Sequence, residues 1–190
     1  MGGYVVALNT ATGSLIWRFA TNNQIQSSPT VANGIVYVGS YSGYIYALNA
    51  TNGALIWSYR AGGPTYSSPA IVNGVLYVGA NDGNVYALNA NNGGLIWIFY
   101  AGNIVYSSPA VVNNVVYVCS EDSSIYALGQ LTAQRFGRHT SATERPHRRF
   151  SRSGQRHSLH RLLRRLRLCF RHFIGTVNDV SSFSIANPNN

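Results

Sequence analysis

Residues able to carry out chemistry are scarce in the first two thirds of this 190-residue sequence. Up to Leu128 it holds three carboxylates (Asp82, Glu121 and Asp122), a single thiol at Cys119, and no histidine. A Ser–His or Cys–His nucleophile and a histidine-ligated metal are therefore excluded from this region. Asp82 and Asp122 occupy the same turn of successive repeats, a position typical of solvated hairpin turns rather than of a general acid or base.

The sequence gives equally little evidence for a metal site or a nucleotide site. Glu121 and Asp122 are adjacent, but a hard cation takes about six or more oxygen ligands, so the pair is weak evidence for one. Cys119 and Cys169 follow neither a disulfide nor a zinc pattern, and Cys119 is expected to be a small, buried or half-buried thiol. No glycine-rich turn has the GxGxxG spacing that leads from a strand into a helix.

A repeat of forty residues positions these sparse polar groups. The repeated columns hold Leu8, Leu48, Leu88 and Leu128; Trp17, Trp57 and Trp97; Pro29, Pro69 and Pro109; and Gly13, Gly53 and Gly93. A fixed period of this length is typical of architectures in which each unit buries its apolar face against its neighbours. We expect each tryptophan to pack between two units, where its N–H finds a partner.

Each unit is predicted to form four short strands. In residues 67–102 the segments SSPAIVNG, VLYVGA, NVYALNA and GLIWIFYA are rich in β-branched and aromatic residues and are separated by turn residues. Asn73-Gly74 is a strong signal for a tight hairpin. Helical repeats need longer segments than these turns allow, so the pattern predicts the four-stranded blade of a β-propeller.

The same columns resemble a known family. Ala7-Leu8-Asn9-x-x-Thr12-Gly13-x-x-x-Trp17 and its copies ending at Trp57 and Trp97 look like the tryptophan-docking repeat of the quinoprotein (PQQ-like) β-propellers. The family pattern is roughly Ala-x-Asp-x-x-Thr-Gly-x-x-x-Trp, and this sequence has Asn for Asp in three copies and Asn for Thr in two. The resemblance implies blade geometry. It does not imply the cofactor, because the family includes PQQ-dependent dehydrogenases, scaffold lipoproteins of outer-membrane assembly and non-catalytic cell-surface proteins.

The expected organisation is a partial propeller in residues 1–128, followed by a different segment in residues 129–190. Residues 24–60 and 64–100 form two full blades, residues 1–19 supply the last two strands of another blade, and residues 104–128 supply three strands of a fourth. Propellers close with about four to eight blades, so this arc has two open ends. Open blade ends invite pairing with other chains, including further copies of this one.

The composition changes abruptly after Leu128. All thirteen tyrosines lie before it, whereas all five histidines and twelve of the fourteen arginines lie after it. Up to Leu128, two arginines oppose three carboxylates, a net charge of −1, and beyond it twelve arginines oppose two carboxylates, a net charge of +10. The positive charge of the chain therefore belongs to this tail, which is expected to lack a core and to be mostly disordered or partly helical.

Two interpretations of the tail compete. Residues 157–173 place leucines and phenylalanines on one helical face with arginines mostly elsewhere, a pattern that could bind an anionic membrane or nucleic acid. Alternatively, residues 153–172 are the propeller in a shifted frame. With suitable synonymous codons, a shift of one nucleotide gives VANGIVYIGSYDGYVYALD, nearly identical to VANGIVYVGSYSGYIYALN at residues 31–49. We favour the frameshift.

The sequence thus predicts a non-catalytic fragment of a binding or scaffold protein with protein partners, in a family often found in the periplasm or at the cell surface. No catalytic, cofactor-binding or metal-ligating residue is assigned, and the chain shows no secretory signal at its start. The residues singled out are those of the structural repeat: Gly13, Trp17, Gly53, Trp57, Gly93 and Trp97. The alternatives are a PQQ-dependent dehydrogenase whose active-site blades are missing, and a membrane- or nucleic-acid-binding protein.

Overall fold

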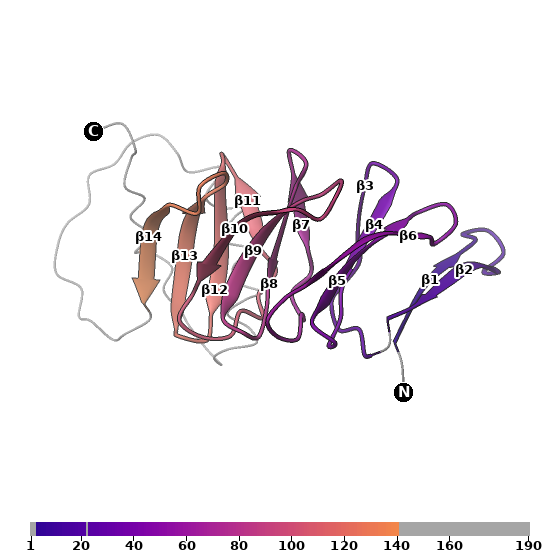
Figure 1. Ribbon diagram of the computed structural model, residues 1–190, viewed down its shortest axis with the longest axis horizontal. Coiled ribbons are helices and arrows are strands. Elements are labelled where there is room, and N and C mark those ends of the chain that lie inside the picture. Colours follow the sequence, from indigo (N-terminus) through magenta and orange to yellow (C-terminus); the bar gives the residue numbers. More distant parts are fainter. Residues whose placement is uncertain (1–2, 22, 141–190) are drawn as a thin grey trace.

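A computed structural model describes residues 3–21 and 23–140 as four antiparallel sheets that follow one another in chain order (Figure 1). The first blade has β1 (Tyr4–Leu8) and β2 (Leu15–Ala20), and the second has β3 (Thr30–Ala32), β4 (Ile35–Gly39), β5 (Tyr44–Asn49) and β6 (Leu55–Arg60). The third has β7 (Ala70–Val72), β8 (Val75–Gly79), β9 (Asn84–Asn89) and β10 (Leu95–Tyr100), and the fourth has β11 (Ala110–Val112), β12 (Val115–Ser120), β13 (Ser124–Gly129) and β14 (Arg135–Thr140). The predicted all-β partial propeller of four-stranded blades is confirmed.

Tight turns join the first two strands of each complete blade. Asn73 and Gly74, between β7 and β8, have φ of 53° and 74°, and Asn33 and Gly34 have 50° and 74°. Two successive positive φ angles are the geometry that matches the right-handed twist of the paired strands. The Asn-Gly pair therefore forms the hairpin that it predicts.

A β-bulge recurs between the third and fourth strands. In the first blade Ala7 pairs with Trp17 and Leu8 pairs with Leu15, which leaves Ile16 as the extra residue of β2. The bulge bends the strand so that Leu15 and Ile16 both face solvent while Trp17 is buried. The other blades shift register at the same place.

The departures from the PQQ-like pattern preserve its turn. The Asn49 side-chain oxygen accepts the N–H groups of Thr51 (2.8 Å) and Asn52 (3.3 Å), as a carboxylate would. The Asn52 side-chain oxygen in turn accepts the N–H of Ala54 (3.0 Å), the bond that Thr12 makes with its hydroxyl to Ser14 (3.3 Å). Asn therefore replaces Asp and Thr without loss of an acceptor.

The fourth blade has one strand more than the three expected of it. β14 pairs with β13 from Ser124–Thr140 to Leu128–Arg135, so the boundary expected at residue 128 falls inside β13. The side chains of this strand do not follow the repeat, and main-chain pairing with β13 holds it in the sheet. The predictions made for residues 141–190, the amphipathic helix and the frameshift, lie outside the described residues.

The hydrophobic core lies between blades. One cluster joins the second and third blades, and it includes Tyr37 and Trp57 on one side and Leu76, Tyr86 and Leu88 on the other. Equivalent clusters lie between the first and second blades and between the third and fourth. Within the described part of the chain, no helix is long and apolar enough to cross a membrane.

Candidate functional site

Three tyrosines form a row that crosses from blade to blade. The rings of Tyr41 and Tyr66 have centroids 5.6 Å apart, and those of Tyr66 and Tyr106 are 5.3 Å apart, both edge to face. Tyr41 lies in the turn between β4 and β5, and the other two lie in the segments that lead into β7 and β11. Edge-to-face contact is the favoured geometry for aromatic pairs, so the rings hold one another in place. We call Tyr41, Tyr66 and Tyr106 the tyrosine row.

Main-chain hydrogen bonds fix the backbone beneath the row. The Tyr41 N–H donates to the carbonyl of Gln24 (2.9 Å). The preceding residue, Ser40, accepts the N–H of Thr65 (3.0 Å), the residue directly before Tyr66. The turn of one blade is thus bonded to the connections on both sides of it, which makes the row a rigid feature of the arc.

A Ser-Ser-Pro motif directly before the first strand of each complete blade (β3, β7 and β11) also supports the row. The Ser67 hydroxyl accepts the N–H of Gly79 (3.1 Å) in its own blade and donates to the carbonyl of Ser107 (2.9 Å) in the next. The Ser68 N–H donates to the Ser108 hydroxyl (3.1 Å). Sequence reasoning assigned no role to these serines, although their exact spacing in the three copies was the available signal.

The row presents partly exposed phenols. Tyr41 and Tyr106 are 42% and 45% exposed, and Tyr66 between them is partly buried. Burial raises the pKa of Tyr66 above its ordinary value, and the neighbouring Tyr41 and Tyr106 raise it further. Tyr66 therefore stays uncharged at neutral pH. Each ring of the row offers an apolar face with a hydroxyl that can donate or accept. Such a surface is suited to binding, not to acid–base chemistry at neutral pH.

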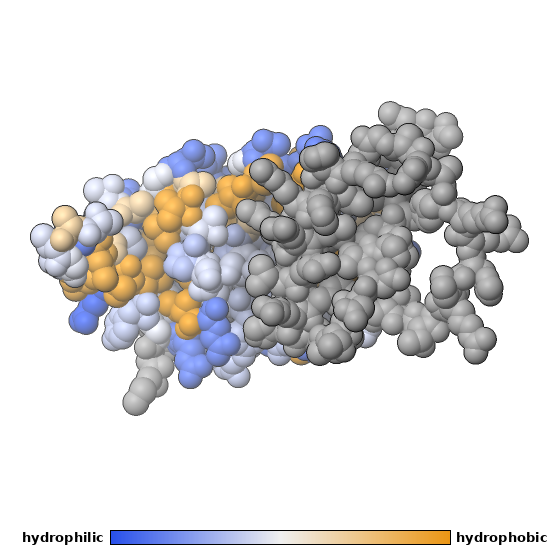
Figure 2. Space-filling view, turned by 180° about the vertical axis from the view of Figure 1, so that it is seen from behind, coloured by the Kyte–Doolittle hydropathy of each residue, from blue (hydrophilic) through white to orange (hydrophobic). Residues whose placement is uncertain are grey.

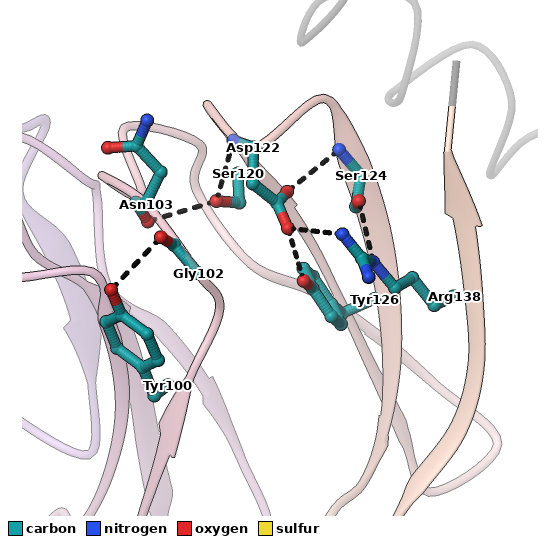
Figure 3. A network of polar contacts seen from close by, with 8 residues as sticks. All are labelled: Tyr100, Gly102, Asn103, Ser120, Asp122, Ser124, Tyr126 and Arg138. Carbon is teal, nitrogen blue, oxygen red and sulfur yellow. Dashed lines mark hydrogen bonds and ion pairs between the residues drawn. The ribbon is translucent and has the colours of Figure 1, made fainter. Parts of the chain in front are cut away.

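Asp122 is the centre of a polar network in the fourth blade (Figure 3). Its carboxylate accepts hydrogen bonds from the Tyr126 hydroxyl and from the N–H of Ser124 (2.9 Å), and it forms an ion pair with Arg138 of β14 (3.0 Å). The Arg138 side chain also donates to the Ser124 hydroxyl (2.9 Å). The network ties the turn after β12 to the outermost strand, which is a structural use of the carboxylate.

Asp82 has the same place in the third blade. It accepts hydrogen bonds from the Tyr86 hydroxyl, from the Asn84 side chain (2.8 Å) and from the N–H of Gly62 (3.1 Å), which belongs to the preceding connection. The sequence placed Asp82 and Asp122 in solvated turns. Both lie in turns, but their side chains are partly buried, and each accepts a hydrogen bond from the tyrosine four residues further along the chain.

Buried tyrosines should make the fold sensitive to alkali. Burial raises the pKa of Tyr77 to about 12, and burial together with Asp82 raises the pKa of Tyr86 to about 12. An unfolded tyrosine titrates near pH 10, so the folded state holds more protons between pH 10 and 12 and stability falls across that window. We expect urea unfolding to show a loss of up to about 1.4 kcal/mol per pH unit for each group.

A Tyr86→Phe variant provides the comparison. Its unfolding free energy should fall less steeply between pH 10 and 12 than that of the wild type, because one phenol with a strongly raised pKa is gone. Equal slopes for the two proteins would contradict a raised pKa at Tyr86.

The residues singled out by the repeat lie at the blade interfaces. Trp17, Trp57 and Trp97 donate from the indole nitrogen to the carbonyls of Ala50 (2.9 Å), Ala90 (2.8 Å) and Gln130 (2.9 Å) of the next blade. A Cβ built on Gly53 or Gly93 would lie 2.6 or 2.8 Å from the ring atoms of Trp17 or Trp57, so these glycines let the indole lie flat on the turn. Gly13 has no such neighbour. These residues shape the stack of blades.

The described residues do not fit pyrroloquinoline quinone. This cofactor is an anionic polycarboxylate, and carboxylates are bound best by arginine. The arginines of the described region all lie on the fourth strands of their blades, and none lies on a first strand (β3, β7 or β11). They are Arg18, Arg60, Arg135 and Arg138. No group of three or more His, Cys, Asp or Glu side chains there could hold a metal ion.

Comparisons with known proteins agree on the architecture. A model of the family described as outer membrane protein assembly factor BamB matches residues 1–190. No curated protein sequence matches the chain significantly. Among solved structures, BamB from Moraxella catarrhalis is similar with a TM-score of 0.64 and 21% identity, over 73% of this chain and 42% of that one.

Two further structures share the fold. The computationally designed Ika8 protein has a TM-score of 0.61 and 18% identity, over 70% of this chain and 42% of that one. The quinohemoprotein alcohol dehydrogenase ADHIIG from Pseudomonas putida HK5 has a TM-score of 0.58 and 22% identity, over 66% of this chain and 22% of that one. The chain thus spans less than half the length of each of these three structures.

Proposed function

Because the chain belongs to the family of the outer membrane protein assembly factor BamB, which is built from PQQ-like repeats, we propose that it is a non-catalytic scaffold that binds other proteins. The observation that supports this proposal is the tyrosine row. Tyrosine is enriched in protein interfaces and among the residues that dominate their binding energy. The proposed partner is a protein of the cell envelope that takes part in outer-membrane protein assembly, by analogy with the family.

Rigidity favours the row as a binding surface. Its rings contact one another, and hydrogen bonds between Tyr41 and Gln24 and between Thr65 and Ser40 hold its backbone. A surface that is ordered before binding loses little conformational entropy when a partner docks. The row also crosses three blades, so a partner bound along it would contact several repeats at once.

The binding role is tested by removing the exposed rings. A tagged Tyr41→Ser/Tyr106→Ser variant is expected to retain at most about a tenth of the partner that the wild type captures from a detergent extract of the cell envelope, since hot-spot tyrosines are worth about 2 kcal/mol or more each. The measurement is quantitative mass spectrometry of the captured proteins. Thermal unfolding should change little, because both side chains are about half exposed.

Tyr100→Ser is the matched control. Tyr100 is also an exposed tyrosine, but it lies on β10, and its ring is not among those that form the row. Its replacement should leave capture unchanged. Equal capture by the row variant and the wild type would contradict the proposal.

The dehydrogenase alternative has its own test. It predicts that the full-length parent protein oxidises an alcohol or a sugar with an artificial dye, and that this activity depends on added pyrroloquinoline quinone and calcium.

A further inference from the structure

β10 is the outermost strand of the third blade and leaves one edge of its sheet open. The N–H of Ala101, directly after the strand, donates to the carbonyl of Gly83, in the turn before β9 (2.8 Å). Because the main-chain groups alternate in direction along a strand, those of Ile98 and Tyr100 point away from β9. The side chains of these two residues are 45% and 64% exposed. We call Ile98 and Tyr100 the β10 edge.

Exposed hydrophobic side chains alone do not select the β10 edge, because every blade has them. Figure 2 shows hydrophobic residues at several places on the surface seen from behind, next to hydrophilic ones. The exposed leucines Leu15, Leu55, Leu95 and Leu131 come from the four blades in turn. Scattered exposed residues of this kind are normal in folded proteins. What distinguishes the β10 edge is its lack of charge.

The other described fourth strands each carry an arginine where β10 has isoleucine or tyrosine. By the forty-residue repeat, β2 has Arg18 and β14 has Arg138 at the position of Ile98. β6 has Arg60 at the position of Tyr100. Charged side chains on an open edge disfavour pairing with a further strand. Among these four strands, β10 alone lacks this protection.

We propose that β10 pairs antiparallel with β10 of a second copy of this chain, around a twofold axis at Phe99. In this register Ile98 lies opposite Tyr100 of the second copy, and Tyr100 lies opposite Ile98 of the second copy. The main-chain groups of both residues point outward, so each of the two pairs exchanges both of its hydrogen bonds. An isoleucine opposite a tyrosine is also a favourable cross-strand contact, because one side chain is β-branched and the other aromatic.

The residues of the edge support a second copy as its occupant. A twofold interface needs a surface that is complementary to itself, and Ile98 and Tyr100 meet this need because each is the favourable partner of the other. The same register fails on β6, where Ser58 would lie opposite Arg60 and the two Arg60 side chains would be diagonal neighbours about 7–8 Å apart. Like charges repel at this separation, which is shorter than the Debye length of about 10 Å at 0.1 M salt.

The dimer is expected to be weak, because a single pair of strands buries little surface. We expect a Kd of about 0.1 mM, in the class of small and transient interfaces. Capture experiments use far lower concentrations, so Tyr100→Ser remains a valid control for the tyrosine row. The β10 edge contains no residue of that row, and the dimer does not rest on the proposed function.

Sedimentation equilibrium of the full-length chain tests for the dimer. The apparent mass should rise from 20.7 kDa towards twice that value as the concentration passes about 0.1 mM. Hydrogen exchange followed by NMR then locates the contact. Exchange should slow with concentration at the amides of Ile98 and Tyr100, which point to the open edge. It should not slow at Phe99, whose N–H points to β9.

Two variants copy the arginines of the other blades. Ile98→Arg reproduces the residue of β2 and β14, and Tyr100→Arg reproduces that of β6, so the blade should tolerate both. Each should weaken the dimer at least about tenfold, since the twofold axis makes every substitution count twice. Ile56→Arg is the matched control, because Ile56 is an isoleucine of similar exposure (44%) on β6. It should dimerise as the wild type does.

Thermal unfolding of the three variants shows whether the fold is retained. A chain that stays monomeric up to about 1 mM, ten times the expected Kd, would overturn the proposal. So would exchange rates at Ile98 and Tyr100 that do not depend on concentration. A dimer that persists in both Ile98→Arg and Tyr100→Arg would also overturn it, and would show that the copies meet elsewhere on the molecule.

Discussion

Replacing Trp57 by alanine is expected to lower the free energy of unfolding by about 3–5 kcal/mol, the range for removing a large buried aromatic side chain. Trp57 is almost fully buried between the second and third blades, where it packs near Tyr37 with ring centroids 5.9 Å apart. The strands on both sides are hydrogen-bonded within their own sheets, so their backbones are held apart when the ring is removed. Urea unfolding followed by far-UV circular dichroism measures the loss.

A Trp57→Phe variant separates ring burial from the hydrogen bond. It keeps an aromatic ring between the blades but loses the indole N–H that donates to Ala90. The Ala90 carbonyl still accepts the Tyr37 hydroxyl (3.1 Å), so it does not become an unsatisfied buried acceptor. The loss should therefore be nearer about 1 kcal/mol. A loss below about 1 kcal/mol for Trp57→Ala would show that the blades do not depend on this contact.

The repeat predicts most of the fold because its signals are local. Asn73 and Gly74 tolerate the positive φ angles that a tight hairpin needs, and the same turn of the other two complete blades also has two positive φ angles. The strand segments can be predicted equally well, because β-branched and aromatic residues fill them. The sequence columns therefore locate the blades, and the family resemblance rests on the same residues.

The end of the fourth blade could not be predicted in the same way. Residues 135–140 read RFGRHT and lack the apolar and aromatic pattern of β6 and β10. The preceding turn contains Ala133 at φ of 54°, where the other blades have glycine. Nothing in these side chains signals a strand or a turn. Pairing with β13 uses main-chain groups, which are present whatever the side chains are.

The tyrosine row was missed because it does not follow one column. Tyr66 and Tyr106 share a column, but Tyr41 comes from a different position in the repeat, and the second blade has Gln26 where the others have tyrosine. Only the packing of adjacent blades brings the β4–β5 turn against the segment before β7. A repeat alignment compares equivalent residues. It therefore cannot predict contacts between non-equivalent residues of neighbouring blades.

Replacing Gly79 by alanine is expected to cost about 3 kcal/mol, near the upper end of the usual range for overpacking a core. A Cβ there would lie 2.4 Å from Cγ1 of Val105 and 2.7 Å from its carbonyl oxygen. Val105 is fully buried, and its N–H donates to the carbonyl of Ala80 (3.2 Å), so its backbone cannot move aside without breaking that bond. Urea unfolding again provides the measurement.

Gly137→Ala is the matched control, because Gly137 also lies in a strand, has no positive φ, and has no atom within 4 Å of its Cβ position. Its replacement should be neutral or stabilising by up to about 1 kcal/mol, since alanine restricts the unfolded chain. Equal effects at the two glycines would exclude steric crowding as the cause.

Two of the three complete blades have glycine at the position of Gly79, and the third has cysteine. The equivalent of Gly79 in the fourth blade is Cys119, which is half-buried. In the second and third blades the segment that enters the next blade crosses this position, at Thr65 over Gly39 and at Val105 over Gly79. Glycine is thus required by the neighbouring blade and not by the strand that contains it. Gly79→Ala should therefore act on the junction between the third and fourth blades.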